Sequence, residues 1–204
     1  MVMALRLHFH PRNNQLLVLA GYESGHCCVW KLNATTTQWQ PSYTYKAHAQ
    51  PVLSLDIASA ADVFYSSSAD AIIARHPLAE ADSVETKLIQ TRHAGQQSLT
   101  VRSDEKVFAT AGWDGRARVY SVHTMKEVAV LKWHKEGCYA LAFAQVEERN
   151  RESDGDMDHG REQAENTVVK RELTVSQRRI TKARSTHWLA AGSKDGKISL
   201  WDIY

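Results

Sequence analysis

A turn recurs along this chain about every 45 residues, and this repeat restricts the fold more than any other feature. The turn positions are Ser24, Asp70, Asp114 and Asp195, with gaps of 46, 44 and 81 residues. A ring-bearing side chain follows each of them six residues later, at Trp30, His76, Tyr120 and Trp201. A period of about 40–45 residues is typical of one four-stranded blade of a β-propeller.

A second marker has the same period. A histidine lies shortly before the first strand of each later repeat, at His48, His93 and His134. The first two precede the next turn aspartate by 22 and 21 residues, whereas the third precedes it by 61 because the last repeat carries an insertion. We therefore expect repeats at about residues 5–47, 48–92, 93–133 and 134–204, with the insertion at 146–186.

Alternating apolar and polar residues surround each turn. Asp-Gly at positions 114–115 and 195–196 stands between two such runs, which is a strong hairpin signal because glycine tolerates the positive φ that the turn needs. The pattern predicts four strands in each of the first three repeats, three strands in the last and no helix. The predicted class is all-β.

The run Gly192–Gly196 followed by Trp201 resembles the end of a WD40 repeat. In that family a His, a Ser or Thr, an Asp and a Trp form a buried, hydrogen-bonded tetrad. The resemblance implies a complete tetrad in repeat four, made of His134, Ser193, Asp195 and Trp201. The partial sets are His93, Asp114 and Tyr120 in repeat three, with Gly112 replacing the serine, and His48, Ser68 and Asp70 in repeat two, with His76 replacing the tryptophan. Repeat one keeps Trp30 and lacks the aspartate.

Closed rings of this family usually have about seven blades. The four repeats are therefore expected to be the C-terminal part of a seven-bladed WD40 β-propeller, or the product of a truncated gene model.

Three segments, 110–120, 132–140 and 187–204, resemble the WD-repeat subunits of the fungal ASTRA assembly. This resemblance implies a nuclear, non-catalytic scaffold whose partners are the other protein subunits of an ASTRA-type assembly. It also implies a link to chromatin remodelling and to the maturation of large phosphatidylinositol-kinase-like proteins.

Composition limits the other partners. The 204 residues include 25 Lys and Arg and 23 Asp and Glu, so the net charge of +2 does not favour nucleic acid or an acidic membrane as the main partner. The three cysteines, Cys27, Cys28 and Cys138, have the spacing of neither a disulfide framework nor a zinc site. Because no segment has the length of a signal peptide core or a membrane span, a soluble intracellular protein is expected.

The insertion divides into an acidic and a basic part. Residues 147–165 hold eight carboxylates and three arginines, and residues 170–184 hold six basic residues and one glutamate. This composition predicts a disordered spacer. A docking or nuclear-import segment through Lys170-Arg171 and Arg178-Arg179 is the alternative, and Ser153 and Ser176 are candidate phosphorylation sites.

Metal binding is not expected in the insertion. Its acidic part matches an EF-hand loop at Asp154, Asp156, Asp158, Glu162 and Glu165. However, His159 stands where calcium loops need glycine for a sharp turn.

Two further function classes stay open beside the scaffold. One is a propeller enzyme or small-ligand receptor using the central channel, although no nucleophile elbow or phosphate-binding loop is found and no catalytic, cofactor or metal residue is predicted. The other is a signalling adaptor like the G-protein β subunit, whose N-terminal helical coil has no counterpart here. For a scaffold, the candidate anchors are the aromatics Trp39, Tyr43, Trp113 and Trp133.

Overall fold

The strands of the computed structural model form four antiparallel sheets. The structure describes residues 1–33, 35–78, 85–93, 95–146 and 174–203. In every sheet, strands that follow one another in sequence are hydrogen-bonded neighbours. We call the sheets blades one to four, and they confirm the predicted all-β class with four WD40-like blades.

The described residues form fifteen strands in these blades. Blade one consists of β1 (Val2–Phe9), β2 (Leu16–Tyr22), β3 (His26–Leu32) and β4 (Trp39–Lys46). Blade two consists of β5 (Val52–Ala58), β6 (Val63–Ser68), β7 (Ile72–Pro77) and β8 (Lys87–Gln90). Blade three consists of β9 (Gln96–Val101), β10 (Val107–Gly112), β11 (Arg116–Ser121) and β12 (Glu127–Lys132). Blade four consists of β13 (Cys138–Phe143), β14 (Trp188–Ser193) and β15 (Ile198–Asp202).

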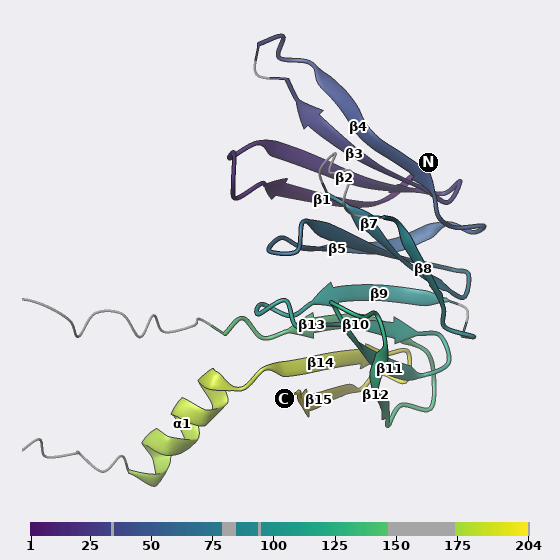
Figure 1. Ribbon diagram of the computed structural model, residues 1–204. Helices are drawn as coiled ribbons and strands as arrows, with labels where there is room; N and C mark the ends of the chain where they lie inside the picture. Colours follow the sequence, from purple (N-terminus) through teal and green to yellow (C-terminus); the bar gives the residue numbers. More distant parts are fainter. Residues whose placement is uncertain (34, 79–84, 94, 147–173, 204) are drawn as a thin grey trace, which may run out of the picture.

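The hydrophobic core lies between the blades. Figure 1 shows the four sheets following one another, and the first strands of neighbouring blades contact each other. Three apolar clusters fill the spaces between blades one and two, two and three, and three and four. Each sheet is therefore buried on the face that meets its neighbour, which explains why strands such as β6 are buried at every position.

Strand alternation gives each blade two different faces. In β5, Leu55 packs toward blade one, whereas the hydroxyl of Ser54 contacts the backbone of Leu99 in blade three. In β1, Arg6 pairs with Asp56 of blade two, so Leu5 and Leu7 point to the opposite face and are exposed. At the other end of the series, Ile198 and Leu200 of β15 are exposed too. These two apolar faces are not covered by any described residue.

The turn between β10 and β11 in blade three depends on glycine. Gly115 has φ +77°, and a Cβ at this position would lie 2.8 Å from the carbonyl oxygen of Glu136. Both the conformation and the close approach of the backbones therefore favour glycine after the turn aspartate. The close approach brings the turn of blade three against the loop that leads into blade four.

A buried ion pair connects blades three and four. The guanidinium of Arg102 donates to both carboxylate oxygens of Asp104 at 2.7 and 2.8 Å. Its remaining amino group donates to the carbonyl oxygen of Ile203 at 2.9 Å. Burial opposes ionisation of Asp104, but hydrogen bonds from Arg102 and the Lys106 amide outweigh it and hold the pKa of Asp104 below its ordinary value.

This ion pair predicts a loss of stability in acid. Because the pKa of Asp104 is lower in the folded chain than in the unfolded chain, its contribution is complete above about pH 4 and disappears as pH falls through the folded value. Urea unfolding between pH 7 and pH 3 should show a smaller loss of unfolding free energy for Asp104→Asn than for wild type. Parallel curves would show that Asp104 has no part in the acid transition.

A helix departs from the prediction that the chain has none. α1 (Val175–Ser185) lies in the insertion and contacts β14 only through its C-terminal end (Figure 1). Its first turn is stabilised by a capping box, in which Thr174 and Gln177 each accept from the other's backbone amide. Ser176 lies in this first turn. Ser153, Lys170-Arg171 and the EF-hand-like residues fall outside the described residues.

Among the described residues, no three His, Cys, Asp or Glu side chains converge as a metal site would require. The described helix is too short and too polar to cross a bilayer.

Candidate functional site

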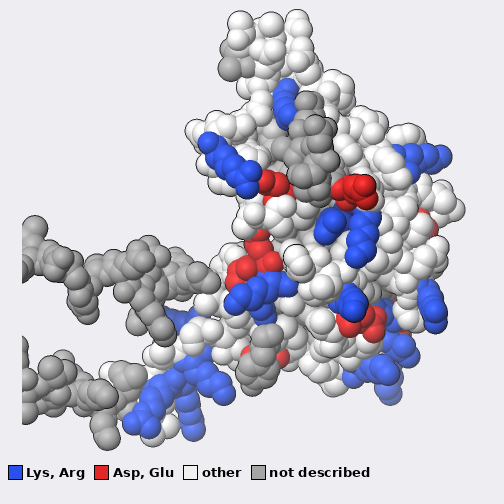
Figure 2. Space-filling model, viewed as in Figure 1, with Lys and Arg blue, Asp and Glu red and all other residues white. Residues whose placement is uncertain are grey.

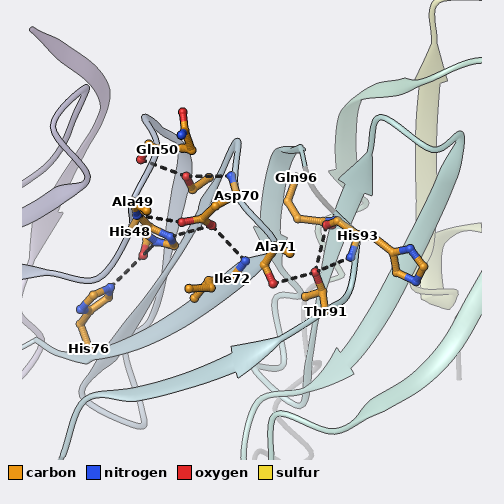
Figure 3. Close-up of polar contacts among 12 residues, drawn as sticks. His48, Ala49, Gln50, Asp70, Ala71, Ile72, His76, Thr91, His93 and Gln96 are labelled. Carbon is orange, nitrogen blue, oxygen red and sulfur yellow. Dashed lines mark hydrogen bonds and ion pairs between the residues drawn. The ribbon is translucent and has the colours of Figure 1, made fainter.

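A chain of side-chain hydrogen bonds runs through blade two. His48 contacts Asp70 at 3.2 Å through Nδ1 and Ser66 at 2.8 Å through Nε2. Ser66 in turn lies 2.8 Å from Nε2 of His76, whose Nδ1 is 3.0 Å from the hydroxyl of Tyr43. Figure 3 shows His48 between Asp70 and the bond that leads to His76. Since Tyr43 belongs to β4, the chain joins blade two to blade one.

The carboxylate of Asp70 fixes the direction of these bonds. A carboxylate only accepts, so Nδ1 of His48 donates to it and Nε2 of His48 accepts from Ser66. Ser66 then accepts from Nε2 of His76, and Nδ1 of His76 accepts from the hydroxyl of Tyr43. The pKa values fit this neutral arrangement, because burial lowers that of His76 to about 3, lowers that of His48, and raises that of Tyr43 to about 12.

The backbone holds Asp70 in place. Its carboxylate accepts from the amides of Ala49 and Ile72 at 3.0 and 2.9 Å, as Figure 3 shows. Ser68 donates to the carbonyl of Gln50 and accepts from the amide of Asp70. Asp70 therefore holds its own turn against the loop that follows β4 of blade one.

Asp70, His48 and Ser66 have the order of a nucleophilic triad but not its accessibility. The Ser66 and His76 side chains are fully buried, and His48 is 2% exposed. A serine nucleophile must meet its substrate, and this one is enclosed between two blades. This burial indicates a structural role for the three residues.

Blade four contains the same chain with a tryptophan at its end. His134 lies 3.2 Å from Asp195 and 2.9 Å from Ser199, and the indole of Trp201 donates to Ser199 at 2.8 Å. In blade two, Nε2 of His76 takes the place of the indole N–H. Because imidazole has a second nitrogen, the blade-two chain continues to Tyr43, whereas the chain in blade four stops at Trp201.

The structure corrects both serine assignments. Ser193 donates to the carbonyl oxygen of Glu136 and does not contact His134, and Ser68 has the matching role in blade two. The hydroxyl that meets the histidine is Ser66 in one blade and Ser199 in the other. Residues equally far from the turn aspartate face each other across the hairpin, and these pairs are Ser66 with Ala74 and Ala191 with Ser199. The hydroxyl that contacts the histidine can therefore come from either residue of this cross-strand pair. The second strand supplies it in blade two and the third strand supplies it in blade four.

Blade three has an ion pair where the tetrad was expected. Both oxygens of Asp114 accept from the guanidinium of Arg118, whose side chain is 1% exposed. His93 lies farther away, 3.7 Å from Asp114, and its side chain is 37% exposed. Although burial opposes ionisation of Asp114, hydrogen bonds from Arg118 outweigh it and hold the pKa of that carboxyl below its ordinary value. Tyr120 stacks on Phe108 with ring centroids 5.2 Å apart.

Gly112 explains why the arginine fits. It occupies the position of Ser68 and Ser193, two residues before the turn aspartate. A Cβ at Gly112 would lie 2.5 Å from Oδ1 of Asp114 and 3.1 Å from Nη1 of Arg118. A serine side chain at position 112 would displace the ion pair, so the pairing of Asp114 with Arg118 requires glycine there.

A cluster of exposed aromatic side chains lies beside these turns. Trp133 and Tyr139 are 53% and 44% exposed, and Trp113 is 44% exposed. We call these three residues the aromatic rim. A Cβ at Gly137 would lie 3.0 Å from the backbone of Trp113 and 3.1 Å from the ring of Tyr139, so both residues lie next to Gly137.

Hydrogen bonds and close contacts hold the aromatic rim in place. The carbonyl of Gly137 accepts from the amide of Lys194 at 3.0 Å, and the ammonium of Lys197 lies 5.8 Å from the centre of the Trp133 ring. Trp113 donates to Gln97 at 2.9 Å and covers Gly95, where a Cβ would meet the indole at 2.0 Å. The rim is therefore prearranged, which lowers the entropy that a partner must overcome on binding.

The other two expected anchors lie elsewhere. Tyr43 is tied into the blade-two chain, where its hydroxyl also lies 2.8 Å from Thr86. Trp39 is exposed on β4 of blade one. Tyr139 was not predicted as an anchor. It is the second residue of β13, close to the turn that contains Trp113, and is 44% exposed.

Two surface hollows differ in the acid–base groups that line them. One of about 750 Å³ on blade one is lined by amides, apolar side chains, Ser42 and Lys31, without a His, Cys, Asp or Glu. Another of about 530 Å³ between blades two and three includes His123, Asp104 and Glu105. Asp104 is bound to Arg102, and Glu105 accepts from the backbone amides of Ser59 and Ala60.

Comparison with known proteins finds a matching repeat family and several similar proteins. The model of the family described as WD domain, G-beta repeat matches residues 39–74, 86–121 and 178–202. ASTRA-associated protein 1 of Verticillium alfalfae is 50% identical over 211 residues, which cover 100% of this chain and 50% of that protein. A mouse protein named guanine nucleotide-binding protein subunit beta-like protein 1 is 32% identical over 92% of this chain and 44% of its own length.

The chain spans about half the length of the curated relatives named ASTRA-associated protein 1 that it matches. Among solved structures, the computationally designed Ika4 protein superposes with a TM-score of 0.61 at 15% identity, covering 100% of this chain and 92% of that one. This last likeness shows the fold alone.

Proposed function

The chain belongs to the WD40-repeat proteins, and from this premise we propose that it is a non-catalytic scaffold that presents its aromatic rim to other protein subunits. The observation that carries the proposal is the contrast between buried and exposed groups. The serine and histidine side chains of the Ser-His-Asp sets are buried, whereas Trp133, just after β12, and Tyr139, in β13, are exposed. Fixed, exposed aromatic side chains are the anchors that dominate binding energy in many protein interfaces.

The proposed identity of the partners is based on the names of similar proteins. We propose that the partners are subunits of an ASTRA-type assembly and that the chain acts in the nucleus in chromatin remodelling. Support comes from the name of relatives that are 44–50% identical over the full chain. A signalling adaptor like the G-protein β subunit has less support, because the mouse relative is 32% identical.

The rim can be tested against an aromatic residue on another blade. Trp133→Ala combined with Tyr139→Ala removes two exposed rings, and Trp39→Ala removes a similarly exposed ring from blade one. Each tagged variant is expressed in fungal cells, and copurifying subunits are quantified by mass spectrometry. Loss of a binding anchor typically costs about 2 kcal/mol or more, so we expect at least a roughly 30-fold weaker interaction for the double variant.

The melting temperatures of both variants should match wild type. Recovery of the same subunits in the same amounts from both variants would remove the aromatic rim from the proposal. Recovery of no subunits by folded wild-type protein would contradict the scaffold itself.

A further inference from the structure

The insertion helix α1 carries a concentrated positive charge. Its basic residues are Arg178, Arg179, Lys182 and Arg184, and the eleven-residue helix contains no carboxylate. None of its side chains is buried, and no described carboxylate pairs with any of the four cations. Figure 2 shows Lys and Arg side chains gathered over this protruding element. Charges of one sign at short spacing create a local attraction for polyanions.

The helix is anchored at its C-terminal end. The hydroxyl of Thr186 donates to the carbonyl of Lys182 at 2.7 Å, and the indole of Trp188 donates to the carbonyl of Ala183 at 3.1 Å. These bonds satisfy carbonyls that would otherwise lack partners at a helix end. Since Trp188 belongs to β14, the first turns of α1 project away from blade four while its last turn stays attached (Figure 1).

The distribution of the cations distinguishes among polyanions. Arg178 and Lys182 are one turn apart on one side, whereas Arg184 lies on the other side of the helix. Val175 and Ile180 are exposed and do not form an apolar stripe. A helix that docks in a protein groove or on a membrane needs such a stripe. Cations on two sides instead suit a ligand that flanks the helix with negative charge on both sides.

We propose that α1 binds the phosphate backbone of double-stranded DNA without base specificity. A helix about 10–12 Å across fits the major groove of B-form DNA, where phosphates lie along both edges. The major groove of A-form RNA is too narrow for side chains to enter, which favours DNA. The net charge of +2 does not argue against DNA binding by α1, because it is a sum over the whole chain and does not show that four cations lie together on one helix. DNA binding by α1 does not depend on the aromatic rim.

The test compares two triple variants of equal charge change. R178Q/R179Q/K182Q removes three of the four positive charges of α1 and keeps its helix, since glutamine is a good helix former. K126Q/K132Q/K135Q neutralises three exposed lysines of blade three and its following loop. Fluorescence anisotropy with a 20-base-pair duplex measures affinity for the full chain between 50 and 200 mM salt, and circular dichroism confirms that each variant is folded.

Each phosphate contact contributes about −0.9 to the slope of log affinity against log salt. We expect a slope of about −3.6 for wild type and for the blade-three variant, and about −0.9 for the α1 variant. If the two proteins bind equally at 1 M salt, the α1 variant should bind roughly 500-fold more weakly at 0.1 M salt. Arg184→Gln alone should reduce the slope by about 0.9, which provides a milder variant.

Three outcomes would overturn the proposal. One is equal binding by the α1 variant and wild type, and another is the same loss in both triple variants. The third is a polyglutamate peptide of matched charge that binds at least as tightly as the duplex, because the partner would then be an acidic protein.

Discussion

Asp114→Ala is expected to destabilise the chain by about 3 kcal/mol, more than other changes in blade three, because it leaves a buried arginine without its carboxylate. Breaking a buried ion pair by removing one partner typically costs about 3–5 kcal/mol. The side chain of Arg118 is 1% exposed and donates two hydrogen bonds to the carboxylate of Asp114. The lower end of the range applies, since Glu127 remains 3.6 Å from the guanidinium.

The matched control is His93→Ala. If blade three contained the expected tetrad, this histidine would contribute as much as the aspartate. The structure instead places His93 3.7 Å from Asp114 with its side chain 37% exposed, and exposed pairs contribute about 0–1 kcal/mol. Urea unfolding at pH 7 measures both variants. Equal losses would mean that the histidine, and not Arg118, holds the aspartate.

The sequence predicts the blades but not every polar partner within them. The repeat period and the positions of the turn aspartates and histidines can be predicted from the sequence spacing, since each blade repeats the same hairpin geometry. His48 and His134 do meet Asp70 and Asp195. Arg118 could not be assigned, because a charged residue in a strand is ordinarily exposed and only tertiary packing encloses this one. Gly112 was the available signal, since it removes the side chain that would occupy the guanidinium's place.

The serine errors have a different origin. Ser68 and Ser193 match the family motif in sequence, but they lie two residues before the turn aspartate and bond to the preceding loop. Counting outward from the aspartate finds the correct position, because residues four before and four after it face each other across the hairpin. The helix α1 was missed for a local reason: its capping box stands in a charged insertion without apolar periodicity.

Ser66→Ala is expected to cost about 3 kcal/mol, against about 1 kcal/mol for Ser68→Ala. Removing the Ser66 hydroxyl leaves an acceptor nitrogen on His48 and a donor N–H on His76 without partners, both inside the blade. Each unsatisfied buried polar group costs about 1–3 kcal/mol. Ser68 makes two bonds to backbone groups near the surface turn, so its loss resembles that of an ordinary hydrogen bond.

Moving the hydroxyl across the hairpin tests this account further. Ala74 is the cross-strand partner of Ser66, and blade four already has the reverse arrangement with Ala191 opposite Ser199. The double variant Ser66→Ala with Ala74→Ser should therefore recover at least about 1 kcal/mol of the loss caused by Ser66→Ala, measured as the coupling energy of a double-mutant cycle. If Ala74→Ser adds its own loss to that of Ser66→Ala, the two strands cannot exchange the hydroxyl. The tetrad serine would then depend on its strand, whereas recovery would show that the fold requires only a hydroxyl between the histidine and the next donor.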